Sequence, residues 1–232
     1  MEGWKSENSL TRLLIADDHA IFAESLRASL EKGFDVVGIV TNGRAMIQEA
    51  TRLMPDLVIA DIGMPLLNGL DAARRIKECV PRVKFVFVTM QDDPNLAAAA
   101  LELGRIAFVL KHSGIHELRK AIECVLHGES YLTPKLRPVD WTETRARARQ
   151  FSKELTSRQR DIVQLFAEGG SLKEIAGELN LSEKTVEFHK HHIMTAFNLK
   201  SNAALVLFAL KRHLISIDPD VSTSVFRHRA DI

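Results

Sequence analysis

The sequence predicts two domains: an α/β domain built on a doubly wound, five-stranded parallel sheet, and an all-α domain of four helices. In residues 12–130, short apolar runs alternate with helical periods, which is typical of a parallel sheet covered by helices on both faces. A polar, charged segment with prolines follows at 131–151, and we interpret it as a linker. Residues 152–215 show only helical periods. The 232 residues suffice for two separate cores.

Strands and helices of the first domain are predicted from these patterns. The apolar runs predicted as strands are residues 13–16, 34–40, 57–60, 83–88 and 106–110. The segments predicted as helices are residues 21–30, 45–53, 70–80, 94–103 and 115–126. The strand runs are apolar almost throughout and do not alternate with polar residues. This indicates strands that are buried on both faces.

The charge balance is nearly neutral, with 31 basic and 30 acidic residues and a net charge of +1. This total does not exclude nucleic-acid binding, because an acidic domain joined to a basic one gives the same sum. Cys79 and Cys124 lack metal-ligand spacing and indicate free thiols in a reducing compartment. The most apolar stretch, residues 96–110, carries charges and is too short to span a membrane. We therefore expect a soluble, cytoplasmic protein with no membrane partner.

Polar residues follow directly on four of the predicted strands. Asp17 and Asp18 follow the first strand, Asp61 the third, Thr89 the fourth and Lys111 the fifth. In open parallel sheets the ligand site lies at the carboxyl ends of the strands. Three carboxylates in one pocket repel one another and require a cation. A hard divalent ion such as Mg2+ prefers oxygen ligands of this kind.

These residue types suit the transfer of a phosphoryl group. A carboxylate such as that of Asp61 can act as a nucleophile and form an aspartyl phosphate. The metal and the Lys111 ammonium would offset the charge of the transferring group, and the Thr89 hydroxyl could donate to one of its oxygens. Structural alternatives exist for single residues: Asp17 or Asp18 could cap the next helix, and Thr89 could cap a turn.

The order of these residues resembles the receiver domain of two-component response regulators, which has a flavodoxin-like fold. The resemblance covers residues 12–130 and includes the loop DIGMPLLNGL at residues 61–70. It implies that Asp61 is the phosphoacceptor. The Mg2+ ligands that it implies are Asp17, Asp18, Asp61 and the carbonyl oxygen of Gly63. The conformational switch that it implies is formed by Thr89, Phe108 and Lys111.

Two positions depart from the receiver pattern. The residue after Thr89 is usually small, whereas here it is Met90, which could crowd the phosphoryl pocket. Arg105 replaces a small residue before the last predicted strand and could alter a partner or dimer surface.

Four helices are predicted in the second domain. Thr156, Ser171 and Ser182 are suited to cap the first three helices. A tight turn at Asn180-Leu181 separates the second and third helices, which is the helix-turn-helix pattern. The fourth helix is predicted at residues 202–213. Candidate buried residues of the third helix are Val186, Ile193 and Phe197.

This pattern resembles the LuxR/NarL-type helix-turn-helix domain over residues 152–215. Matching segments include LT at 155–156, KEIA at 173–176 and TV at 185–186, with His189 further along. With the receiver domain before it, the whole chain resembles the NarL/FixJ class of regulators.

The third helix is expected to enter the major groove of double-stranded DNA. By resemblance, the side chains that face base edges are those of Glu187, Phe188 and His191. The side chains expected to contact phosphates are Lys184, Thr185 and Lys190. The fourth helix would pair two domains into a homodimer through Val206 and Ala209. Alternatively, it is an ordinary core helix.

Together these features predict a transcription regulator of a two-component system, in which a sensor histidine kinase phosphorylates Asp61. Thr89 would bind the phosphoryl group, Phe108 would turn inward, and a homodimer would bind DNA. One alternative, to which Met90 points, is a phosphorylation-independent DNA-binding regulator whose receiver is a dimerisation module. Another is a phosphohydrolase of the haloacid dehalogenase type. That class needs an acid two residues after the nucleophile, where Gly63 stands, so we do not expect an enzyme.

Overall fold

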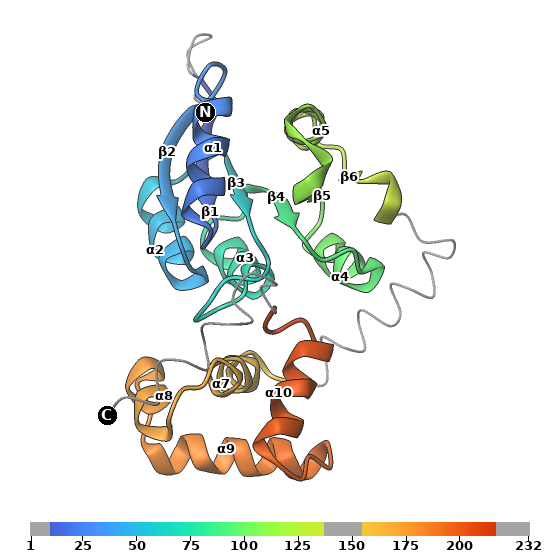
Figure 1. Ribbon diagram of the computed structural model, residues 1–232. Helices are drawn as coiled ribbons and strands as arrows, with labels where there is room; N and C mark the ends of the chain where they lie inside the picture. Colours follow the sequence, from blue (N-terminus) through green and yellow to red (C-terminus); the bar gives the residue numbers. More distant parts are fainter. Residues whose placement is uncertain (1–9, 137–154, 217–232) are drawn as a thin grey trace. The chain divides into compact units, whose positions relative to one another are not determined.

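The computed structural model describes residues 10–136 and 155–216 (Figure 1). The chain divides into two compact units between Leu155 and Thr156. The first unit is α/β and the second is all-α, as the sequence predicts. Among the described residues, no helix is both long and apolar enough to cross a membrane.

The first unit is built on a parallel sheet. Its strands are β1 (Arg12–Ala16), β2 (Asp35–Val40), β3 (Leu57–Ala60), β4 (Lys84–Thr89), β5 (Ile106–Leu110) and β6 (Tyr131–Leu132). Their order is β2-β1-β3-β4-β5-β6, and every neighbouring pair is parallel. The register sets Ala16 beside Ala60 and Thr89 beside Leu110. The residues that follow these strands therefore emerge at one edge of the sheet.

Five α-helices cover the two faces of this sheet (Figure 1). They are α1 (Ala20–Leu30), α2 (Gly43–Leu53), α3 (Gly69–Cys79), α4 (Pro94–Leu101) and α5 (Ile115–Leu126). Buried residues of α1 and α5 pack in one cluster, and those of α2, α3 and α4 in another. In β1, Leu13 belongs to the first cluster and Leu14 to the second. Because successive side chains point to opposite faces, a strand covered on both sides reads as a continuous apolar run.

A sixth strand corrects the predicted count of five. β6 pairs with β5, so that Leu132 lies beside Phe108. A short 3-10 helix, η2 (Pro134–Leu136), follows and buries Leu136 completely. Residues 131–136, which the sequence pattern assigns to the linker, therefore pack on the α/β unit. The rest of the predicted linker lies within residues 137–154, outside the described residues.

The second unit contains the four predicted helices. They are α7 (Ser157–Ala167), α8 (Leu172–Leu179), α9 (Glu183–Ala196) and α10 (Asn202–Lys211). Thr156 and Ser171 each form a capping box, and the Ser182 side chain accepts a hydrogen bond from the Thr185 N–H. These caps satisfy amide groups that the helices leave without a partner. The predicted helix starts are therefore confirmed, and α10 ends two residues earlier than residue 213.

Burial in the second unit agrees with most of the predicted core. Val186 and Ile193 are buried. Phe197 is half-buried and packs against the tilted Phe208 ring, with 4.7 Å between the ring centroids. Ala209 is fully buried. Its burial does not support the expected dimer contact, which stays a prediction. Val206 is half-buried and keeps part of its surface exposed.

Gly69 provides a test of how tightly the first unit is packed. A Cβ atom added there would lie 1.9 Å from the carbonyl oxygen of Asp61. We expect Gly69→Ala to lower the free energy of unfolding by roughly 1–3 kcal/mol, because backbone must move to accept the methyl group. Gly177→Ala is the control, since nothing lies within 4 Å of its added Cβ. Calorimetric unfolding of both variants measures the difference, and equal stabilities would contradict the prediction.

Candidate functional site

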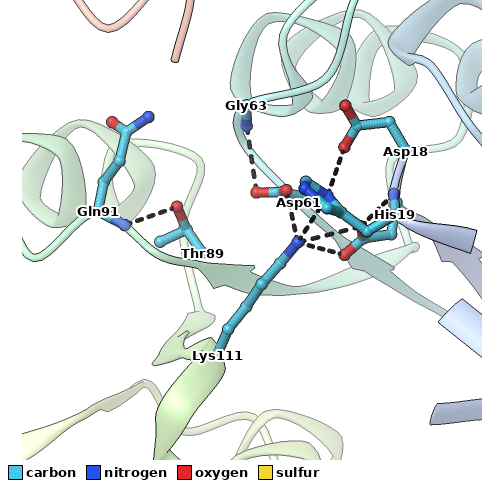
Figure 2. A network of polar contacts seen from close by, with 8 residues as sticks. Asp18, His19, Asp61, Gly63, Thr89, Gln91 and Lys111 are labelled. Atoms are coloured by element: carbon cyan, nitrogen blue, oxygen red, sulfur yellow. Dashed lines mark hydrogen bonds and ion pairs between the residues drawn. The ribbon is translucent and has the colours of Figure 1, made fainter. Parts of the chain in front are cut away.

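Carboxylates gather at the edge of the sheet where β1 and β3 end. The Asp61 N–H donates to the Ala16 carbonyl at 2.8 Å, and the Asp17 N–H donates to the Val40 carbonyl at 2.9 Å. These bonds continue the ladders of the sheet and bring both side chains to one place (Figure 2). Asp17 and Asp61 are almost completely buried, with exposed fractions of 2% and 6%.

Lys111 leaves the end of β5 and reaches both carboxylates. Its Nζ lies 2.8 Å from Asp61 Oδ2 and 2.8 Å from Asp17 Oδ2 (Figure 2). The Phe22 ring of α1 lies against the same ammonium, 4.7 Å from Nζ to the ring centroid. Three residues that are distant in the sequence thus form one buried ion-pair cluster. Removing one partner from such a cluster leaves an uncompensated charge.

His19 also belongs to this cluster, although the sequence analysis did not identify it. Its Nδ1 lies 3.0 Å from Asp18 Oδ1 and 3.2 Å from Asp17 Oδ1. The only available signal was its position directly after the two aspartates. His19 is also the residue at the N-cap of α1, and its side chain makes no capping bond. Neither aspartate occupies that position, which removes the helix-cap interpretation of Asp17 and Asp18.

The electrostatics of the pocket favour an additional cation. Burial raises the pKa of Asp17, and the Asp61 carboxylate raises it further. Burial also raises the pKa of Asp18, against the opposing effect of His19. Burial alone would lower the pKa of Lys111, but the carboxylates of Asp61 and Asp17 outweigh it and raise that pKa. The single ammonium of Lys111 therefore faces three carboxylates, which leaves the pocket with a net negative charge.

The donor set fits a hard divalent cation. Ligand atoms of Asp17, Asp18, His19 and Asp61 all lie within 4.8 Å of one another. Carboxylate oxygens are the ligands that Mg2+ prefers, and the ion keeps part of its water shell at sites of this kind. The backbone of Gly63 also reaches the site, because its N–H donates to Asp61 Oδ1 at 3.2 Å.

A buried network holds the loop that follows Asp61. Asn68 caps α3 by accepting from the Asp71 N–H at 2.8 Å, and its side-chain amide donates to Asp71 Oδ2 at 2.9 Å. Arg74 donates to the other oxygen of Asp71 at 2.6 Å. Asp71 thus ties the end of this loop to the first turn of α3.

The switch residues lie beside the cluster. Thr89 is buried, and its hydroxyl accepts a hydrogen bond from the Gln91 N–H at 3.2 Å. Phe108 is fully buried next to Phe87, with 6.5 Å between ring centroids. Met90, expected to crowd the pocket, is 60% exposed and extends largely into solvent.

The second unit presents a helix with exposed polar and aromatic side chains. α9 follows α8 through a turn in which Asn180 adopts a left-handed conformation with φ of 53°. The exposed residues of α9 include Lys184, Glu187, Phe188 and His191. Thr185 and Lys190 are half-buried, and the Lys190 ammonium lies 4.4 Å from the Phe166 ring centroid. Phe188 is 66% exposed.

Comparisons with known proteins identify both domains. Residues 13–123 match the response regulator receiver domain, and residues 153–209 match the bacterial regulatory proteins of the luxR family. The oxygen regulatory protein NreC of Staphylococcus epidermidis is 35% identical over 215 residues, which cover 88% of this chain and 99% of NreC.

Solved structures of the RcsB response regulator are also similar. One from Salmonella typhimurium is 28% identical, with a TM-score of 0.60 over 87% of this chain and 97% of RcsB. Another, from Salmonella enterica serovar Typhimurium, is bound to a promoter in the presence of the phosphomimetic BeF3−. It is 28% identical, with a TM-score of 0.58 over 88% of this chain and all 100% of that chain.

The raised pKa of Asp18 gives a testable pH dependence. The folded chain holds a proton on Asp18 more tightly than the unfolded chain, whose pKa is near 3.8. By linkage, the contribution of Asp18 to the free energy of unfolding falls as pH rises from below 3.8 through the raised value. In EDTA, Asp18→Asn should therefore gain stability relative to the wild type across this window.

Urea unfolding of both proteins at a series of acidic pH values measures this difference. Mg2+ should reduce it, because bound cation offsets the charge on Asp18. A difference that does not change with pH would contradict the prediction.

Proposed function

Since this chain belongs to the family of response regulators that join a receiver domain to a luxR-family DNA-binding domain, we propose that phosphorylation of Asp61 controls its activity as a transcription regulator. The observation that carries this proposal is the buried cluster in which one ammonium contacts both Asp61 and Asp17 at 2.8 Å. A sensor histidine kinase is the proposed phosphodonor, and double-stranded DNA in the cytoplasm is the proposed target.

The phosphotransfer step follows from the position of Asp61. A carboxylate oxygen of Asp61 attacks the phosphorus atom of a phosphohistidine on the kinase, and the phosphorus–nitrogen bond breaks. The imidazole leaves and takes up a proton from water. Lys111, already in contact with Asp61, is in place to pair with the phosphoryl oxygens. Mg2+ bound by Asp17, Asp18, Asp61 and the Gly63 carbonyl would neutralise further charge on this group.

The switch uses the Thr89 hydroxyl as a hydrogen-bond donor. Its oxygen accepts from the Gln91 N–H, and we propose that its O–H turns to donate to a phosphoryl oxygen. Phe108, which is buried behind this site, is the proposed aromatic partner of the switch. The surface around α4 and β5 would then favour a homodimer.

DNA recognition is assigned to α9. We propose that Glu187, Phe188 and His191 face base edges, since all three are exposed. Lys184, Thr185 and Lys190 would hold phosphates and orient the helix in the major groove. A homodimer through α10 would use Val206, and a solved structure of two RcsB dimers on two parallel DNAs is 29% identical with a TM-score of 0.50.

A second candidate function is a regulator that binds DNA without phosphorylation. The feature that points to it is Met90, which stands where receiver domains usually have a small residue. A phosphohydrolase is not proposed, since Gly63 occupies the place where that class needs an acid.

Phosphorylation control is tested with the phosphomimetic BeF3− in the presence of Mg2+. We expect the wild type to become a dimer and to bind a genomic fragment library more tightly and selectively. Asp61→Asn should neither dimerise nor bind DNA more tightly when BeF3− and Mg2+ are added. The control is Asp92→Asn, which changes an exposed aspartate after β4 and should behave as the wild type. Sedimentation and DNA binding measure both effects. Equal DNA binding with and without BeF3− would leave the phosphorylation-independent regulator as the better proposal.

The two kinds of DNA contact are separable by their salt dependence. Lys184→Ala should weaken binding to all sequences alike and reduce the slope of log affinity against log salt by about 1. Glu187→Gln should instead change which sequences are preferred. Lys32→Ala, at an exposed lysine of the α/β unit, is the control for a general loss of positive charge. If the salt slope is the same for Lys184→Ala and the wild type, Lys184 does not contact a phosphate.

A further inference from the structure

Thr133 connects the end of β6 to two elements of the site. It is a buried polar residue with an exposed fraction of 5%. Its hydroxyl donates to Glu117 Oε1 at 2.6 Å and accepts from the Leu110 N–H at 3.3 Å. Its own N–H donates to the Phe108 carbonyl at 3.0 Å. Thr133 thus holds the backbone of β5 on both sides of Val109.

The position of these contacts bears directly on Lys111. Leu110, whose N–H donates to Thr133, is the residue before Lys111, and a short 3-10 helix, η1 (Lys111–Ser113), begins there. Glu117 lies in the first turn of α5, which starts shortly after η1. The Thr133 hydroxyl therefore bridges the element that ends before Lys111 and the element that begins after it.

The two hydrogen bonds of this hydroxyl differ in strength. The bond to the Glu117 carboxylate is short and assisted by charge. The bond from Leu110 is longer than the usual 2.9–3.0 Å for such pairs. The Thr133 hydroxyl is therefore held more tightly by Glu117 of α5 than by the Leu110 N–H of β5.

The same segment leads toward the DNA-binding domain. Leu132 and Leu136, on either side of Thr133, belong to the buried cluster that also contains Phe108. Residues 131–136 therefore follow β5 as a packed unit. They are also the last described residues before the segment 137–154, after which the second unit begins at Thr156.

We propose that Thr133, held by Glu117, is a positioning residue that sets Lys111 against Asp61 and passes a change at Lys111 to the segment leading out of the receiver. This inference rests on the proposed phosphorylation of Asp61. When Lys111 shifts toward a phosphoryl oxygen, the peptide between Leu110 and Lys111 shifts with it. The length of the hydrogen bond from Leu110 to Thr133 then changes, and the position of β6 changes with it.

The test compares variants of the full chain that keep or remove the hydroxyl. Thr133→Val preserves the shape but not the hydrogen bonds, and Thr133→Ser retains the hydroxyl. We expect Thr133→Val to bind BeF3− with Mg2+ about threefold to tenfold more weakly, as for loss of one buried hydrogen bond. Thr133→Ser should restore the affinity. Thr51→Val is the matched control, because its hydroxyl bonds only to Ile47 within α2.

Glu117→Leu gives an independent variant, since it removes the anchor and leaves Thr133 in place. It should weaken BeF3− binding to the same extent, and the double variant with Thr133→Val should be no weaker than either single variant. Thermal unfolding shows whether each variant folds. If Thr133→Val does not fold, the affinities of Glu117→Leu and Thr133→Ser are compared instead. Additive effects of the two substitutions would overturn the proposed pair.

The proposed effect of Thr133 on β6 and on DNA affinity is measured at saturating BeF3−. In the wild type, amide hydrogen exchange at Leu110 and Thr133 should change on BeF3− binding, and DNA affinity should rise. In Thr133→Val, the rise in DNA affinity should be smaller even when the site is filled. A Thr133→Val variant that matches the wild type in BeF3− affinity and in DNA response would overturn the inference. Failure of the wild type itself to bind BeF3− would overturn the proposed function instead, and the inference with it.

Discussion

The contact of the Lys111 ammonium with Asp17 and Asp61 is the interaction on which the first unit depends. Two buried carboxylates on adjacent strands repel each other strongly in a low-dielectric site. The Lys111 ammonium, 2.8 Å from each carboxylate, offsets this repulsion and lowers the free-energy cost of burying them. This requires β1, β3 and β5 to end at the same edge, which the register of the parallel sheet provides. The sheet and the charge cluster therefore constrain each other.

The loops around this cluster are held by their own buried networks. Asp71 ties the loop after Asp61 to α3, and the absence of a side chain at Gly69 lets α3 approach the Asp61 carbonyl. On the other side, Thr133 and Glu117 tie the end of β5 to α5. Asp61 and Lys111 thus lie on backbone segments that are held by hydrogen bonds from two directions.

In the second unit, α9 is held in place on one face and exposed on the other. Thr156, Ser171 and Ser182 cap its first three helices and set where each begins. Val186 and Ile193 anchor one face of α9 in the core. The opposite face is left free for Lys184, Glu187 and Phe188. A rigid helix with an exposed face is what recognition in a DNA groove demands.

By itself, the sequence determined the alternation of strands and helices, the residues at the strand ends, and the helix caps. These are local properties, because burial on one or two faces leaves a period in the chain and a cap needs only its own first turn. The tertiary structure decided β6, whose two residues are too few to show a period, and the place of His19 against both aspartates. It also decided that Ala209 faces inward, because α10 is apolar on most sides and its pattern does not reveal which side the core covers. Pairing across the sheet and packing between helices involve residues far apart in the chain, and no local pattern records them.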